Sequence, residues 1–159
     1  MPKLLLFPVL ALMLLVGGCS DPSIIPFAGY WDGQFKVQPA DPGVKMRPEW
    51  VYKGYLQVYA TNRNFKMHME SIAQIVDISG KWTNKGNKLY LKADKVEFDD
   101  KGGKVVRPNG VNPIDPDAVR AAYSQEMVYE MSSDKKYLTS LDMSMGPVIG
   151  KHVFKKGGE

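Results

Sequence analysis

The sequence FKMHME at residues 65–70 decides the fold, because apolar and polar side chains alternate in it at every position. Successive side chains of a β-strand point to opposite faces, so this alternation predicts a strand with Phe65 on its buried face. The polar turn 61–64 comes just before it, and residues 52–60 carry a second alternating run. The two runs and the turn predict an antiparallel hairpin.

Alternating runs separated by turns or loops also occur before and after this hairpin in the sequence. Residues 39–48 hold three prolines and a glycine, which predicts a long loop because proline lacks the amide hydrogen that a sheet needs. The short alternating runs predict an all-β fold, a single antiparallel up-and-down meander barrel of about eight to nine strands with one short helix. Besides the hairpin, runs that can form strands lie at about residues 29–38, 72–82, 89–91, 96–98, 105–106, 127–131, 137–142 and 150–155.

The helix signal follows an irregular stretch. Asp115 is the expected N-cap, and Pro116 is expected at the first helical position. Val119, Ala122 and Tyr123 then form one apolar stripe at helical spacing. So short a helix does not stand alone, and we expect it to lie across a barrel opening as a fixed plug or a mobile lid. The lack of paired glycine hinges around it favours the plug.

Composition argues against catalysis. The chain has two histidines and one cysteine, and it lacks Gly-x-Ser-x-Gly, His-Glu-x-x-His and a phosphate-binding glycine loop. Eleven prolines and 15 glycines suit a β protein with many turns. We therefore expect no enzymatic activity and no resident cofactor.

The N-terminus is typical of an export signal. Residues 1–3 carry a positive charge, and residues 4–16 are an unbroken apolar run. The run is too short to span a bilayer as a permanent helix. Cys19, which follows it, is the single cysteine of the chain, so no intramolecular disulfide is possible.

Val16, Gly17, Gly18 and Cys19 together resemble a bacterial lipobox. The resemblance implies cleavage before Cys19 and attachment of lipid to the sulfur and the amine of that residue. Because Ser20 rather than aspartate follows, similarity to enterobacterial lipoproteins implies anchoring in the outer membrane, facing the periplasm. The alternative is an ordinary cleaved signal with a chance cysteine beside the cut.

The lipobox resemblance also divides the chain. It implies a lipoprotein signal peptide at residues 1–18, a lipidated tether at 19–28 and a β-barrel domain at 29–156. Removing 18 of the 159 residues leaves 141, enough for one domain with one core. The net charge of +4 includes Lys3, so the cleaved chain carries +3. A charge so small and scattered argues against nucleic acid as a partner.

Two glycine–aromatic strand starts carry a second resemblance. The segments Gly29-Tyr30-Trp31 and Gly80-Lys81-Trp82 are similar to strand starts of lipocalin-like bacterial lipoproteins, of META-like proteins and of the N-terminal domain of the copper-resistance lipoprotein NlpE. This resemblance implies a lipocalin-like barrel with both indoles buried near one end. The Cys-x-x-Cys of the NlpE family is absent, so no copper-sensing role follows.

Candidate ligand-binding residues are Trp31, Trp82 and Tyr123, facing a small apolar ligand inside the barrel. The alternative is that these side chains only fill the interior, as is usual in small barrels. The tyrosines that would join them in either case are Tyr52, Tyr55, Tyr59, Tyr90, Tyr129 and Tyr137.

Paired methionines are candidate ligands for copper(I), because this ion binds well to thioether sulfur and to imidazole nitrogen. In the run 67–69, strand alternation sends both methionines inward and His68 outward, so core packing is the better interpretation. Met143 and Met145 lie near a strand end and remain weak metal candidates.

A set of lysines forms another candidate binding surface. They form either a basic patch for anionic envelope components or an ordinary solvated face. The lysines concerned are Lys81, Lys85, Lys88, Lys92, Lys151, Lys155 and Lys156.

The sequence thus predicts a non-enzymatic envelope module attached to the membrane through lipidated Cys19. The leading hypothesis is a barrel that holds a small apolar ligand. Its rival is a structural or interaction lipoprotein with a filled barrel that docks on an envelope protein. Copper(I) handling is a third, weaker hypothesis.

Overall fold

The computed structural model describes residues 21–39, 41, 43, 51–72, 74–101, 116–145 and 148–157. Within them the chain forms one nine-stranded antiparallel sheet and the helix α1, Pro116–Ser124. The strands are β1 Gly29–Pro39, β2 Val51–Val58, β3 Asn64–Glu70, β4 Gln74–Lys85, β5 Lys88–Asp100, β6 Met127–Met131, β7 Tyr137–Ser140, β8 Met143–Met145 and β9 Val148–Lys156.

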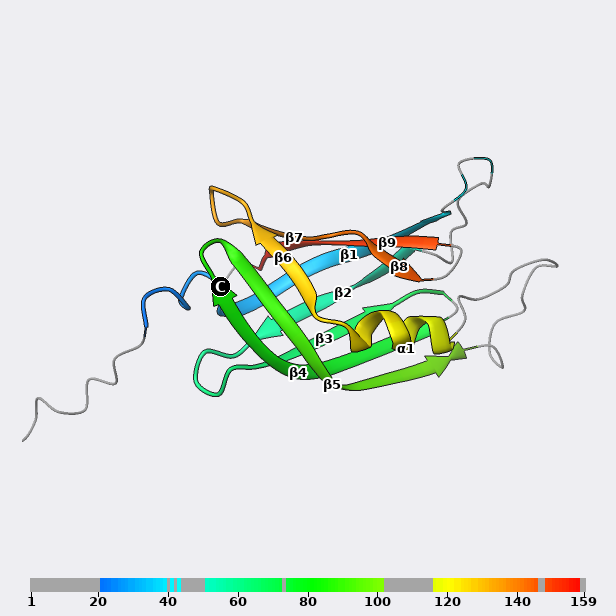
Figure 1. The fold of residues 1–159 in the computed structure, drawn as a ribbon, viewed down its shortest axis with the longest axis horizontal. Helices are drawn as coiled ribbons and strands as arrows, with labels where there is room; N and C mark the ends of the chain where they lie inside the picture. The colour runs from blue at the N-terminus through cyan, green and yellow to red at the C-terminus, as the bar shows by residue number, and fades with distance from the viewer. Residues whose placement is uncertain are drawn as a thin grey trace, which may run out of the picture.

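The sheet closes on itself, which confirms the predicted up-and-down barrel (Figure 1). Strands β1 to β7 are neighbours in chain order, β9 follows β7, and β9 pairs with β1 to complete the ring. The extra strand β8 pairs with the first residues of β9, whereas β7 pairs with residues 153–155 of the same strand. Eight strands therefore form the barrel, and β8 extends the edge that β7 begins.

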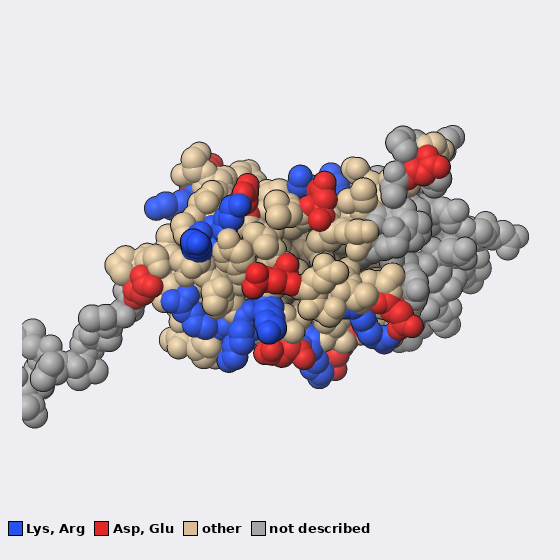
Figure 2. All heavy atoms as spheres, in the orientation of Figure 1, with Lys and Arg blue, Asp and Glu red and all other residues tan. Residues whose placement is uncertain are grey.

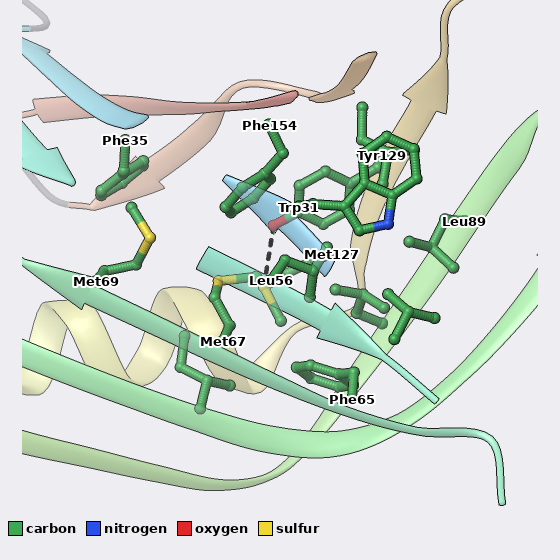
Figure 3. Close-up of a cluster of buried hydrophobic side chains, with 14 of the residues drawn as sticks. Trp31, Phe35, Leu56, Phe65, Met67, Met69, Leu89, Met127, Tyr129 and Phe154 are labelled. Carbon is green, nitrogen blue, oxygen red and sulfur yellow. Dashed lines mark hydrogen bonds between the residues drawn. The ribbon is translucent and has the colours of Figure 1, made fainter. Parts of the chain in front are cut away.

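The predicted alternation is what builds the core. On β3, Phe65, Met67 and Met69 are buried, and on β1 and β2 the same rule buries Trp31 and Leu56. These side chains meet the inward residues of β6 and β9 in one continuous cluster (Figure 3). Burial of this apolar surface, at about 25 cal/mol per Å², is the main force that holds the barrel together.

One strand prediction was wrong in a way that the structure explains. The segments 89–91 and 96–98, predicted as separate strands, are parts of the single long strand β5. A register shift between Ser79 and Gly80 leaves one extra residue on β5, so inward positions change from odd to even numbers along it. The broken period of two made one strand look like two. The predicted strand 105–106 lies outside the described residues.

Gly80 is needed at this shift. A Cβ atom there would overlap the carbonyl oxygen of Lys92 on β5, so only glycine lets the two backbones come this close. The requirement for glycine at position 80 thus comes from the irregularity between β4 and β5.

Helix α1 begins at Pro116, as predicted, while the expected N-cap Asp115 lies outside the described residues. Strand β6 pairs with β5 only along 88–91. Beyond that point α1 packs against β5 and β8, and it buries Val119, Ala122 and Tyr123. The opening that the helix covers is therefore in the barrel wall. No helix among the described residues is long and apolar enough to cross a membrane.

Part of the predicted tether is packed structure. Residues 21–28 form turns at the barrel end that also holds the β2–β3, β4–β5 and β6–β7 connections (Figure 1). Ile24 and Phe27 are buried in the core cluster, and the Lys156 ammonium donates to the Pro26 carbonyl at 3.0 Å. The packed domain thus starts ahead of residue 29.

Candidate functional site

The two predicted indoles lie buried at this same barrel end. Trp31 and Trp82 have exposed fractions of 0% and 1%. Their Nε1 atoms donate to the carbonyls of Phe27 and Tyr59, each at 2.9 Å. Because both donors are used within the protein, these residues act here as framework. Their predicted part in ligand binding stays a prediction.

Cations cover both indoles from the rim. The Arg63 guanidinium lies 4.5 Å from the centroid of the Trp82 ring, and the Lys156 ammonium lies 5.2 Å from that of Trp31. A cation–π contact made at the protein surface contributes about 0.5–1 kcal/mol.

Tyr123, the third predicted residue, joins a buried polar cluster that sequence reasoning missed. His152 on β9 is fully buried. Its Nε2 lies 2.9 Å from the Tyr123 hydroxyl on α1, and its Nδ1 contacts the Tyr129 hydroxyl on β6. The backbone N–H of His152 donates to the Ser140 hydroxyl at 2.8 Å. The His152 imidazole thus joins α1 and β6 to β9, and the backbone amide of the same residue joins β7.

The directions of these hydrogen bonds follow from the partners. The Tyr129 hydroxyl also donates to the sulfur of Met127, 3.9 Å away (Figure 3), which leaves its oxygen to accept from His152 Nδ1–H. The Tyr123 hydroxyl then donates to Nε2. A neutral imidazole provides this combination of one donor and one acceptor. The cluster therefore satisfies itself with His152 uncharged.

Burial sets the titration of the same groups. It lowers the pKa of His152 from 6.5 to about 3, and it raises the pKa values of Tyr123 and Tyr129 well above 10, in each case because the charged form loses water. Burial also raises the pKa of Tyr52 to about 12. All four groups are neutral across the physiological range.

The plug and lid hypotheses for α1 make opposite predictions. If the Tyr123–His152 bond fastens α1, the pair of changes Val119→Ser and Tyr123→Ser should destabilise the whole domain. Tyr123→Phe alone should cost about 1–3 kcal/mol, because His152 Nε2 loses its donor in a buried site. Thermal unfolding measures both, with the exposed Tyr137→Phe as control. Backbone amides of 121–123 exchanging hydrogen much faster than those of 76–78 would contradict the plug.

The other tyrosines divide between the two faces of the sheet. The Tyr52 hydroxyl is inside and donates to the Gln74 side chain. Tyr55, Tyr59 and Tyr90 are only partly buried, and Tyr137 is 41% exposed. The prediction that they line the interior together was therefore wrong for the outward ones.

The methionine pairs show core packing where they are described. Met67 and Met69 are buried while His68 is on the outer face, as predicted. Met143 packs against the core; the side chain of Met145 lies outside the described set, as does Cys19. Among the described residues no group of three or more His, Cys, Asp or Glu side chains is placed to hold a metal ion.

A second site lies on the outside of the barrel, and we call it the outer hollow. It is a depression of about 800 Å³ across β7, β9, β1, β2 and β3. One side carries a stack in which Tyr30 and Tyr55 are 5.2 Å apart and Tyr55 and His68 are 5.5 Å apart, centroid to centroid. The other side carries Tyr137 and Val153, both more than 40% exposed.

Two glycines lie in the wall of the outer hollow. Gly33 and Gly54 face each other across β1 and β2 at inward positions. A Cβ at Gly33 would overlap the Phe154 ring, and one at Gly54 would overlap the His68 carbonyl. Glycine at these two positions therefore allows β9 to approach β1, and β3 to approach β2, more closely than a side chain would.

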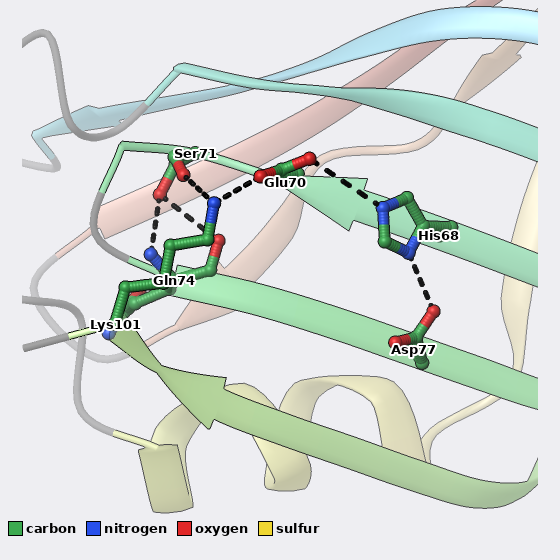
Figure 4. A network of polar contacts seen from close by, with 6 residues as sticks. All are labelled: His68, Glu70, Ser71, Gln74, Asp77 and Lys101. Atoms are coloured by element: carbon green, nitrogen blue, oxygen red, sulfur yellow. Dashed lines mark hydrogen bonds and ion pairs between the residues drawn. The ribbon is translucent and has the colours of Figure 1, made fainter. Parts of the chain in front are cut away.

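The carboxylates beside the hollow are already engaged (Figure 4). His68 Nδ1 is 2.7 Å from Asp77. Lys101 contacts Glu70 and, chiefly through that hydrogen bond, lowers the pKa of its carboxyl. Asp32 interacts with Tyr30, whose pKa is raised by loss of hydration and then by the Asp32 charge.

Three lysines of the hollow have no such partner. Lys36, Lys53 and Lys155 are exposed and line the depression. In the described ranges none of them forms an ion pair with a carboxylate, although Lys53 is opposite Glu70 in the β2–β3 register. Asp32 also lines the hollow, opposite Lys155 in the β1–β9 register. With Glu70 bound by Lys101, three lysines face one further carboxylate, so the outer hollow carries an excess of positive charge.

The lysine patch predicted from sequence behaves differently. Lys88 pairs with Glu130 at 3.1 Å, Lys151 with Asp142 at 3.7 Å, and Lys81 donates to Asn64. On the face shown in Figure 2, basic and acidic side chains are interspersed. This favours the ordinary solvated face for that set, Lys155 excepted.

Compared with known proteins, the chain matches no family model and no curated protein sequence. The lipoprotein and lipocalin-like resemblances therefore remain predictions from the residues that carry them.

Proposed function

We propose that this protein is a lipid-anchored, non-enzymatic accessory module of the bacterial cell envelope, whose barrel is filled and whose binding surface is external. Cys19 in its lipobox-like context supports the anchor. The closed, packed barrel supports a binding or structural role over catalysis. Of the two hypotheses drawn from the sequence, this is the filled-barrel one.

The observation that carries the choice is the state of the inward polar groups. Trp31 and Trp82 donate to backbone carbonyls, and His152 bonds to two tyrosines. A site that orients a ligand needs polar groups free to bond with it. Here those groups are bonded within the protein, whereas three lysines of the outer hollow form no ion pair with a carboxylate in the described part of the chain.

Native mass spectrometry of the full lipidated protein, released from detergent micelles, tests the choice. We expect the mass of the chain plus its anchor and nothing more. A co-purified small apolar molecule, lost on unfolding, would favour the ligand-holding barrel instead. Bound copper would favour the third hypothesis.

The anchor has its own test. Cys19→Ser should abolish stable membrane attachment, because a hydroxyl cannot form the thioether on which lipobox processing depends. One acyl chain gives only marginal attachment and further chains make it stable, so the change should move the protein out of the membrane pellet and the detergent phase. Ser20→Ala is the matched control and should fractionate as the parent does. A Cys19→Ser protein that still partitions with membranes would contradict the lipoprotein proposal.

A further inference from the structure

We propose that the outer hollow binds an anionic glycan segment of the cell envelope, and that Lys36, Lys53 and Lys155 hold its negative groups. The choice of ligand rests on the proposed envelope location. The site itself rests on the residues of the hollow, so the two are tested separately.

Charge is the first step of the argument. The three ammonium groups come from three neighbouring strands, β1, β2 and β9. Glu70 and Asp77, the nearest carboxylates on β3 and β4, are bound by Lys101 and His68 (Figure 4). Asp32, which lines the hollow opposite Lys155, is the remaining carboxylate of the described lining. Three lysines therefore face one carboxylate that no lysine binds, and an incoming anion meets an excess of positive charge. Such a field favours anionic ligands and their association rate.

Spacing is the second step. Lys155 and Lys53 are on strands separated by β1, and two strand spacings come to about 10 Å. Lys36 is further along β1, beside the Lys151 register position. A single small anion cannot contact ammonium groups that are this far apart. An extended ligand that carries several negative groups can contact all three lysines.

Shape is the third step, and it separates a chain from a membrane. The hollow is a depression of about 800 Å³ whose wall includes Gly33 and Gly54. A flat bilayer surface meets the rim of such a depression, while a projecting chain enters it. A membrane surface is therefore the less favoured source of negative charge.

The walls supply the rest of the recognition. Tyr137 and Val153 on one side, and the stack of Tyr30 and Tyr55 on the other, are exposed or half-buried. Aromatic rings with a polar edge suit ligands that have both apolar C–H surfaces and hydroxyls, as sugars do. Gln34 lines the floor between them and offers both a donor and an acceptor.

The test is equilibrium binding of the full-length protein in detergent to three probes. One is a muropeptide oligomer, whose negative groups are carboxylates. The second is a deacylated lipopolysaccharide core oligosaccharide, whose negative groups are phosphates. The third is a neutral dextran oligosaccharide. We expect binding to at least one anionic probe that weakens with added salt, and none to dextran; which anionic probe binds identifies the source.

Charge variants locate the site. The triple change Lys36→Gln, Lys53→Gln and Lys155→Gln should weaken binding about tenfold or more, since the contacts with the anionic groups are lost. The matched control removes the same charge from outward positions of β3, β4 and β5. Its changes are Lys66→Gln, Lys81→Gln and Lys92→Gln.

The control triple should bind within about twofold of the parent. Tyr137→Ser should also weaken binding without changing the melting temperature, because Tyr137 is on the surface. Equal losses in the two triples would show attraction by net charge alone and overturn the site. Failure of both anionic probes to bind would overturn it too. Neither result bears on the anchor, which Cys19→Ser tests alone.

Discussion

Trp82→Ala should lower the free energy of unfolding by about 3–5 kcal/mol, the usual cost of deleting a large aromatic side chain from a core. The indole is 1% exposed. Its removal leaves a cavity, orphans the Tyr59 carbonyl that Nε1 now satisfies at 2.9 Å, and removes the ring beneath Arg63. The free energy of unfolding of a domain of this size is about 5–15 kcal/mol in total. The substitution would therefore remove a large part of its stability.

Trp31→Ala should behave alike, because Trp31 is fully buried and bonds to Phe27 in the same way. Denaturant unfolding followed by far-ultraviolet circular dichroism is the right measurement, since a fluorescence signal changes when a tryptophan is deleted. Trp82→Phe separates the two contributions by keeping most of the volume and losing the hydrogen bond. Tyr137→Ala, on the surface, is the control and should cost less than about 0.5 kcal/mol. Parent-like curves for both indole variants would mean that the strand faces are reversed.

The burial of these indoles was predictable because strand alternation is a local signal. Each residue of β1 or β3 shows its face through its immediate neighbours, so the sequence was sufficient for the barrel and for most of its core. The signal failed on β5, where an irregularity opposite Gly80 reverses the alternation. It failed again at Ile24 and Phe27, which are buried although the stretch around them looks like a linker.

The candidate sites depend on contacts that no local pattern reports. His152 lies 29 residues from Tyr123 and 23 from Tyr129, and only the packing of α1 against the wall brings them together. The outer hollow depends on the register that places Gly33 opposite Gly54. Its sequence signal was glycine at an inward position on two successive strands, which becomes meaningful only when the pairing is known.

Acid should destabilise the protein through His152, and this is the second large effect. The imidazole has a pKa of about 3 in the folded protein against 6.5 as a free side chain, so the unfolded state binds the proton more tightly. The stabilising contribution is complete above pH 6.5 and is lost as the pH falls from 6.5 toward 3. Over the part of this window down to about pH 4, linkage predicts a loss of roughly 3 kcal/mol.

The groups that face His152 make this loss specific. Tyr123, Tyr129 and Ser140 contact it from α1, β6 and β7, and Phe35 packs on its ring at 4.2 Å from β1. None of them is charged, so none of these contacts compensates an imidazolium.

His152→Gln should therefore be less stable at neutral pH, because amide geometry does not match both tyrosines, but should lose much less stability between about pH 6.5 and 4. His68→Gln, which removes the histidine of the outer face, should keep most of the parent's slope. The measurement is the free energy of unfolding from urea titrations across this range. Equal slopes in the parent and in His152→Gln would mean that the imidazole does not control acid stability, and that the cluster joining α1 to the barrel wall accepts a charge.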